Sequence, residues 1–256
     1  MSDAPEPIPA ATVVIFRTGA ADGPPEILMV TRSRELVFAG GMAVFPGGRV
    51  DPEDYALARK LAEGGDTDEE AHRIAAIRET LEETGLAIGL AGDLDADTAA
   101  EARRLLLEKG ALEPVLEAFD LTLKTDTLTP FARWLPLGLA HDRIFDTRFY
   151  LADLGTGNVE IAVDRTENTN LFWITAQDAL DRADRGDIKL IFPTRRNLER
   201  LAQFASFADA KAHADAHPQR TITPEIVEVA GVQVLRIPDD LGYPVTEEEF
   251  TVVRRG

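Results

Sequence analysis

Three glutamates lie close together in one short stretch of the sequence. The run "IRETLEETGL" at 77–86 contains Arg78, Glu79, Glu82 and Glu83. Carboxylates three and four residues apart on a helix are neighbours and repel each other by a few tenths of a kcal/mol per pair. Hard divalent cations such as Mg²⁺ prefer oxygen ligands, and a bound cation would offset this repulsion. The run therefore raises two hypotheses, a solvated acidic face, which is the more common case for such a triplet, and a site for a cation on a helix.

Three features favour the metal site over the solvated face. The glutamates lie just before Gly85, a typical helix end, where the helix dipole disfavours negative charge. Arg78 precedes them directly and offers a counter-charge. The apolar residues Ile74, Ile77 and Leu81 recur at spacings of three and four, so they define a separate face that can pack into a core.

The wider pattern resembles the Nudix box, G-x5-E-x7-R-E-U-x-E-E-x-G-U, in which U is a bulky aliphatic residue. Its central part, R-E-x-x-E-E-x-G, would arise by chance in roughly one such sequence per thousand. Thr80 stands at the first U position, where its methyl group can still pack. The residues that fit the box are Gly64, Glu70, Arg78, Glu79, Glu82, Glu83, Gly85 and Leu86.

This resemblance implies both the reaction and the roles of the box residues. Nudix hydrolases cleave a nucleoside diphosphate linked to another group, with water substituting at phosphorus. By resemblance, Glu79 and Glu83 are the principal ligands of Mg²⁺ or Mn²⁺, Glu82 lies close behind them, and Glu70 is a supporting ligand. Arg78 orients the glutamates by ion pairing. Several carboxylates on one helical turn can hold the cation while positions stay open for phosphate and water.

A glycine loop precedes the box at an unusual distance. In the family a Pro-Gly-Gly leads almost directly into the box, but here "FPGG" at 45–48 comes well before Gly64. We infer an insertion at about 49–66, and we expect Gly47 and Gly48 to hold the structural role of the loop. Long loops are tolerated because closure entropy grows slowly with loop length.

Other residues are candidates for substrate contacts or for proton transfer. Arg32 and Arg34 follow a predicted strand and could bind a substrate phosphate, or they could face solvent. Glu167 precedes another predicted strand and is a candidate general base, because some Nudix enzymes draw their base from such a loop. The alternative is an exposed loop glutamate without this role, with Glu82 or a metal-bound hydroxide as the base. Asp146 and Arg148 alternate along a strand, and we expect them to pair with each other.

Several stretches resemble one branch of the family, the peroxisomal-type coenzyme A diphosphatases and their bacterial relatives. They are "HRIAAIRETLEETG", "FDTRFYLADL" and "RLAQFASFAD". The coenzyme A signature of the wider group is only partly present. The resemblance implies hydrolysis of coenzyme A or acyl-CoA. Nucleotide sugars or dinucleotide cofactors (NADH, ADP-ribose) are the alternative substrates, and a non-catalytic nucleotide-binding regulator is a third hypothesis.

The elements that must position these residues indicate an α/β fold, in which strands and helices are interleaved. With the resemblance, they predict a Nudix α/β/α sandwich with a mixed sheet and helical insertions. We expect a disordered tail at 1–10 and a single domain at 11–256, with insertions at about 49–66 and 92–119 and a helical and hairpin C-terminal extension. Predicted strands cover 11–18, 26–32, 42–48, 131–137, 145–154 and 170–175, and predicted helices cover 52–63, 67–84, 176–186, 194–207 and 208–217.

Composition limits the classes of function. The 256 residues are 45% hydrophobic, which suffices for a sizeable core. The sequence has no cysteine, so it can form neither a disulfide nor a thiolate site. The formal charge of −18 argues against a nucleic-acid partner. Without a long apolar run or a signal peptide, we expect a cytoplasmic protein that acts on a small molecule and does not enter membranes; a homodimer is one option for its assembly.

Overall fold

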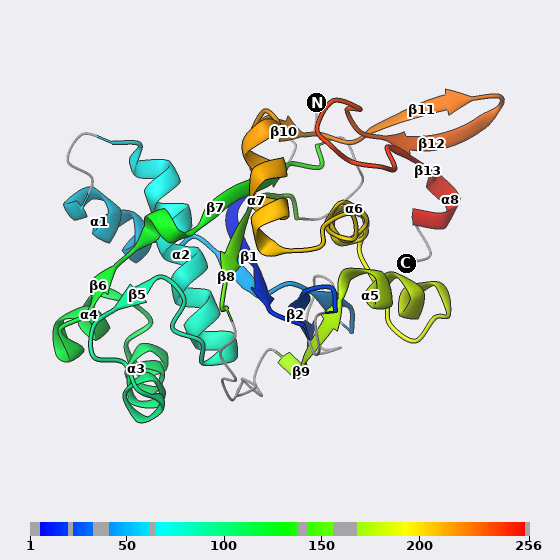
Figure 1. Ribbon diagram of the computed structural model, residues 1–256. Coiled ribbons are helices and arrows are strands. Elements are labelled where there is room, and N and C mark those ends of the chain that lie inside the picture. Colours follow the sequence, from blue (N-terminus) through cyan, green and yellow to red (C-terminus); the bar gives the residue numbers. More distant parts are fainter. Residues whose placement is uncertain are drawn as a thin grey trace.

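A mixed β-sheet forms the centre of the structure (Figure 1). The computed structural model describes residues 6–19, 23–32, 41–61, 65–137, 143–155 and 168–253. The strands of the central sheet are β1 (Ile8–Arg17), β2 (Glu26–Arg32), β3 (Ala43–Val44), β4 (Gly47–Arg49), β7 (Thr129–Trp134), β8 (Phe145–Asp153), β9 (Asn168–Thr175) and β10 (Thr221–Ile222).

The order of strands in this sheet is β10-β7-β8-β1-β2-β3, with β4 paired to β1 and β9 paired to β2. Strand β1 is parallel to β8 and antiparallel to β2 and β4. The predicted mixed sheet is therefore confirmed. The pairing of β4 with β1 places Gly48 opposite Ala11, and this fixes the glycine loop against the centre of the sheet.

Helices cover both faces of the sheet, as predicted for an α/β/α sandwich (Figure 1). Helices α1 to α4 contribute to the core on one face, and helices α5 to α7 contribute to the core on the other. The helices are α1 (Pro52–Leu61), α2 (Thr67–Thr84), α3 (Ala96–Lys109), α4 (Glu113–Phe119), α5 (Ala176–Asp184), α6 (Phe192–Leu201), α7 (Phe207–Ala216) and α8 (Phe250–Val253).

The alternation of side chains along β1 explains the two cores. Val13 and Ile15 point to the face covered by α2, while Val14 and Phe16 point to the opposite face. Because successive strand residues face opposite sides, a strand covered on both faces reads as a continuous apolar run. All four side chains are buried, which agrees with the apolar run "TVVIF" in the sequence.

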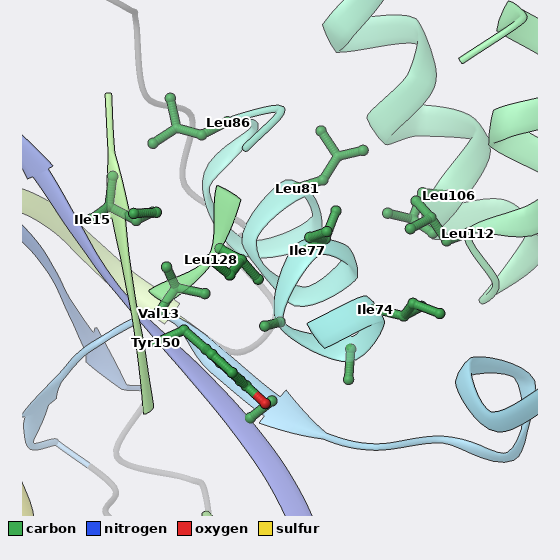
Figure 2. Close-up of a cluster of buried hydrophobic side chains, with 14 of the residues drawn as sticks. Val13, Ile15, Ile74, Ile77, Leu81, Leu86, Leu106, Leu112, Leu128 and Tyr150 are labelled. Carbon is green, nitrogen blue, oxygen red and sulfur yellow. The ribbon is translucent and has the colours of Figure 1, made fainter. Parts of the chain in front are cut away.

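The apolar stripe of α2 forms the first of these cores (Figure 2). Ile74, Ile77 and Leu81 are fully buried and pack with Val13 and Ile15 of the sheet. Burial of each such side chain contributes about 1.5–3 kcal/mol. The predicted stripe is thus confirmed, and it fixes the rotation of α2 about its axis, so that the glutamates face away from this core.

The helical pair predicted at 92–119 is present as α3 and α4, which are separated at Gly110. Leu106 of α3 and Val115 of α4 pack into the α2 core. The strands β5 (Leu90–Ala91) and β6 (Thr122–Leu123), which come before and after this pair in the chain, form a small antiparallel sheet. The helical pair α3 and α4 therefore extends the core that α2 forms with the sheet.

The C-terminal extension contains the predicted hairpin. Strands β11 (Glu225–Val229) and β12 (Val232–Arg236) pair around Gly231, and β13 (Glu247–Glu249) adds a third strand (Figure 1).

The disordered N-terminal tail predicted at 1–10 extends too far along the chain. Strand β1 begins at Ile8, whose backbone pairs with β8, so residues 8–10 belong to the sheet. Among the helices of the described ranges, none is long and apolar enough to span a bilayer.

Candidate metal and catalytic site

Helix α2 carries the glutamates at its C-terminal end. Its N-terminus is capped by Asp66, whose side chain accepts hydrogen bonds from the backbone N–H groups of the first turn. Gly85 ends the helix in the left-handed conformation, with φ of 77°, and donates to the carbonyl of Leu81. Both ends lie where the sequence predicts them, so the register of the box on the helix is fixed.

Arg78 holds two of the glutamates through one end of its guanidinium. Its Nη1 lies 3.0 Å from Oε1 of Glu79 and 3.2 Å from Oε2 of Glu82. Its Nε and Nη2 donate to the carboxylate of Asp54 at 3.0 and 2.9 Å, and Nη2 also donates to the carbonyl of Arg49 at 2.8 Å. Arg78 is therefore paired with Glu79 and Glu82 from a buried position, and its role in orienting them stays a prediction.

The glycine loop cradles the other side of the glutamate cluster. The backbone N–H of Gly47 donates to Oε2 of Glu83 at 2.9 Å. A Cβ atom on Gly48 would lie 2.4 Å from Oε1 of Glu79, and a Cβ atom on Gly47 would lie 2.3 Å from the carbonyl oxygen of Ala11. The two glycines are therefore required by close approach to a carboxylate and to a neighbouring strand.

Burial and mutual repulsion perturb the carboxylates of this cluster. Burial, and then the charges of Glu83 and Glu82, raise the pKa of Glu79 to about 8, against the opposing effect of Arg78. Burial also raises the pKa of Glu82, with Asp54 adding to the shift. A positive charge bound beside carboxyl groups with raised pKa values favours their ionised form, so this cluster is suited to a cation.

The donor chemistry of the cluster fits a hard divalent cation. Glu79, Glu82 and Glu83 offer carboxylate oxygens from one turn of α2, and the cradle at Gly48 leaves no room for a side chain beside Glu79. Within the described ranges no three acidic or histidine side chains already converge on one point. Arg78 holds one oxygen of Glu79 and one of Glu82, and the N–H of Gly47 holds one oxygen of Glu83. Because the three carboxylates do not converge on one point in the described ranges, ligation of one ion requires these side chains to reorient.

Substitution of Gly48 by alanine tests the cradle directly. We expect Gly48→Ala to reduce the affinity for a divalent cation about tenfold, because the new methyl group displaces the carboxylate of Glu79. Titration with Mn²⁺ measures this change. The three atoms nearest to the new Cβ all belong to the end of the Glu79 side chain and none to the backbone, so the melting temperature should change little. If the losses of Mn²⁺ affinity in Gly48→Ala and Glu79→Gln were fully additive in the double variant, Gly48→Ala would not act through Glu79.

The structure does not bring every predicted site residue to this cluster. Glu70 lies nine positions before Glu79 on α2, about 13 Å along the helix, and its Oε1 accepts from the hydroxyl of Thr125 at 2.9 Å. We therefore leave Glu70 out of the proposed ligand set. Arg32 ends β2, and its backbone pairs with that of Asn168.

Three other predicted residues, Gly64, Arg34 and Glu167, lie outside the described ranges. The proposed roles of Arg34 and Glu167 stay predictions from the sequence.

The expected pairing of Asp146 with Arg148 is wrong. Asp146 accepts from Arg133 on the neighbouring strand β7 at 2.8 and 2.6 Å. Arg148 instead donates to Glu69 of α2 at 2.6 Å and also pairs with Asp68. Adjacent strands offer a closer partner than the residue two positions along the same strand. The two pairs of Arg148 connect the sheet to the start of α2.

Two residues near the site were not recognised in the sequence. Asp54 of α1 is 1% exposed and accepts from Arg78 through both carboxylate oxygens. Arg103 of α3 donates to the carbonyl of Glu82 at 2.9 and 2.7 Å, which places a cation at the C-terminal end of α2. Arg103 thereby offsets part of the cost of acidic side chains at this helix end.

Comparisons with known proteins agree with this geometry. The family model described as NUDIX domain matches residues 6–193. An acyl-coenzyme A diphosphatase, NUDT19 of Gallus gallus, is 28% identical over 237 residues, covering 72% of this chain and 63% of that protein. The crystal structure of a NUDIX hydrolase from Alicyclobacillus acidocaldarius is 28% identical with a TM-score of 0.69, covering 81% of this chain and 96% of that one.

Proposed function

Since the chain belongs to the Nudix family, we propose that it is a divalent-cation-dependent pyrophosphohydrolase. Its substrate is a nucleoside diphosphate linked to another group, and its products are two phosphate monoesters. The observation that carries this proposal is the cluster of Glu79, Glu82 and Glu83, held between the guanidinium of Arg78 and the glycine loop. A solvated acidic face would need neither a buried arginine nor a backbone cradle.

Each residue of the cluster has a defined task in this proposal. Glu79, Glu82 and Glu83 would hold Mg²⁺ or Mn²⁺, which when bound supplies Lewis-acid activation and neutralises the phosphates. Arg78 orients Glu79 and Glu82, and Gly47 orients Glu83 through its N–H group. Water attacks one phosphorus atom, and the P–O bond of the anhydride breaks. Glu167 is our first candidate for the base that accepts the proton of this water, with Glu82 as the alternative.

A cation also resolves the problem of charge. The chain carries a formal charge of −18, so its overall field repels a diphosphate. Local positive charge at the glutamates reverses the sign where the substrate binds. The proposed cation dependence therefore follows from the composition as well as from the cluster.

We propose coenzyme A or acyl-CoA as the substrate. The support is the relative named as an acyl-coenzyme A diphosphatase and the partial coenzyme A signature around Thr31, Arg32 and Phe45. Cleavage would release 3',5'-ADP and 4'-phosphopantetheine or its acyl form. Arg32 is a candidate for contact with a substrate phosphate, together with Arg34. Nucleotide sugars, NADH and ADP-ribose are the competing substrates, and a non-catalytic regulator is the competing class of function.

A substrate panel with product masses tests this assignment. We expect kcat/KM for coenzyme A or acetyl-CoA to exceed that for NADH, ADP-ribose and a nucleotide sugar at least tenfold in the presence of Mg²⁺. Mass spectrometry of the reaction in H₂¹⁸O should place one ¹⁸O atom in one phosphate monoester. A tenfold preference for NADH or a nucleotide sugar would overturn the coenzyme A proposal alone. Binding without turnover of any substrate would favour the regulator.

A further inference from the structure

Helix α1 lies in the inferred insertion at about 49–66, and it supplies a buried carboxylate to Arg78 of the box. Asp54 lies in the first turn of α1, and its two oxygens face Nε and Nη2 of Arg78 at 3.0 and 2.9 Å. The exposed fractions of the two side chains are 1% and 3%. The backbone N–H of Asp51 donates to Oδ2 of Asp54 at 2.9 Å, and Oδ2 of Asp51 lies 3.4 Å from Nη2 of Arg78. Two carboxylates of the insertion therefore surround one edge of the guanidinium.

The donors of Arg78 are divided between two sets of acceptors. Its Nε and Nη2 face Asp54 and the carbonyl of Arg49, whereas only Nη1 faces Glu79 and Glu82. A bidentate arginine–carboxylate pair is stronger than a single contact, and burial increases this difference. Asp54 is thus the bidentate partner of Arg78. Glu79 and Glu82 each contact Arg78 through one oxygen and share its third nitrogen.

Loss of Asp54 would change this division of donors. Arg78 would then have no buried counter-charge on the α1 side, and its guanidinium would pair more strongly with Glu79 and Glu82. An arginine that neutralises one of these glutamates competes with a divalent cation for the same oxygens. The pairing of Asp54 with Arg78 would therefore affect the glutamates, in addition to holding α1 against α2.

We propose that Asp54, assisted by Asp51, is a positioning residue that neutralises Arg78 and keeps Glu79 and Glu82 available for the divalent cation. This inference rests on the proposed function, because it assumes that the glutamates bind that cation. The inferred insertion between the glycine loop and the box would then affect metal affinity through Asp54 and Asp51. Partners of metal ligands typically affect metal affinity by about 10–100-fold.

Direct Mn²⁺ binding, followed by electron paramagnetic resonance without substrate, tests the proposal. We expect Asp54→Asn to weaken Mn²⁺ binding about tenfold or more relative to the wild type. The matched control is Tyr55→Phe, which removes the 3.0 Å hydrogen bond from Tyr55 to Asp68, another contact between α1 and α2. Tyr55→Phe should leave Mn²⁺ affinity within about twofold. An equal loss in both variants, or no loss in Asp54→Asn, would overturn the proposal.

A second variant covers the case in which Asp54→Asn does not fold. The side chain of Asp51 is 35% exposed, so Asp51→Asn is expected to fold, and its Mn²⁺ affinity should fall about threefold because the contact is longer. Unchanged affinity in folded Asp51→Asn would then reject the role of the insertion. Failure of the wild type itself to bind Mn²⁺ would instead reject the proposed function, so the two failures are distinguishable.

Discussion

Removal of the divalent cation is expected to reduce hydrolysis at least about a thousandfold, since the charge stabilisation that a metal supplies is worth several kcal/mol. Glu79, Glu82 and Glu83 lie on one turn of α2 in a chain with a formal charge of −18. Without a cation, these carboxylates would repel the diphosphate of the proposed substrate. Turnover in excess EDTA, and again after Mg²⁺ or Mn²⁺ is added back, measures the effect.

The folded state should survive this treatment, because Arg78 already holds Glu79 and Glu82 without a cation. Circular dichroism in EDTA is the control that separates loss of metal from loss of structure. Turnover that persists undiminished in EDTA, with no metal left by elemental analysis, would mean that the glutamates form only an acidic face.

The dependence on the cation should also vary with pH. The pKa of Glu79 is raised to about 8 by burial and by its neighbours Glu83 and Glu82. Below this pH the carboxyl group holds a proton, which the cation must displace, and above it the ionised form is ready to bind. The Mg²⁺ concentration for half-maximal rate should therefore fall as the pH rises from 6.5 to 8.5. A concentration that does not change over this interval would show that Glu79 is ionised throughout.

The local features of the site could be predicted from the sequence because they depend on neighbours in the chain. The spacing of Ile74, Ile77 and Leu81 determines which face of α2 is buried, and this places the glutamates on another face. Gly85 ends the helix because it adopts the left-handed conformation without strain. Such features follow from periodicity and from backbone preference.

The missed features depend on contacts between distant segments. Asp54 looks like an ordinary acid in the first turn of a helix, and only the packing of α1 against α2 places it on Arg78. Asp146 finds Arg133 across the sheet rather than Arg148 on its own strand. Ile8 lies in a proline-rich start but joins the sheet because β8 provides hydrogen-bond partners. Sequence spacing carries no record of these pairings.

The contacts between distant segments also distinguish the glutamates of α2 from one another. Glu83 is buried, and its Oε2 accepts the N–H of Gly47, so its position is fixed by the loop as well as by the helix. Glu70 belongs to the same helix but binds Thr125 away from the cluster. Both residues match the Nudix box, but only Glu83 lies in the glutamate cluster. Substitution of each therefore tests whether the box pattern or the observed geometry identifies the metal ligands.

Glu83→Gln is expected to reduce kcat at least about a hundredfold, in line with the loss of other single electrostatic groups at active sites. Glutamine keeps the size of the side chain, and its oxygen can still accept the N–H of Gly47, but it removes one charge from the metal site. Stability should be unchanged or slightly higher, because one like charge leaves the cluster. Steady-state kinetics at saturating Mg²⁺, with melting curves for each variant, measures both effects.

Two further substitutions complete this last test. Glu79→Gln should behave like Glu83→Gln, because both carboxylates belong to the cluster between Arg78 and the glycine loop. Glu70→Gln should lower kcat less than about threefold, because its partner is a hydroxyl group outside the cluster. If Glu70→Gln were as damaging as Glu83→Gln, the helix would have to change its contacts when the substrate binds. Near-normal turnover in both cluster variants would leave these glutamates without a role in the reaction.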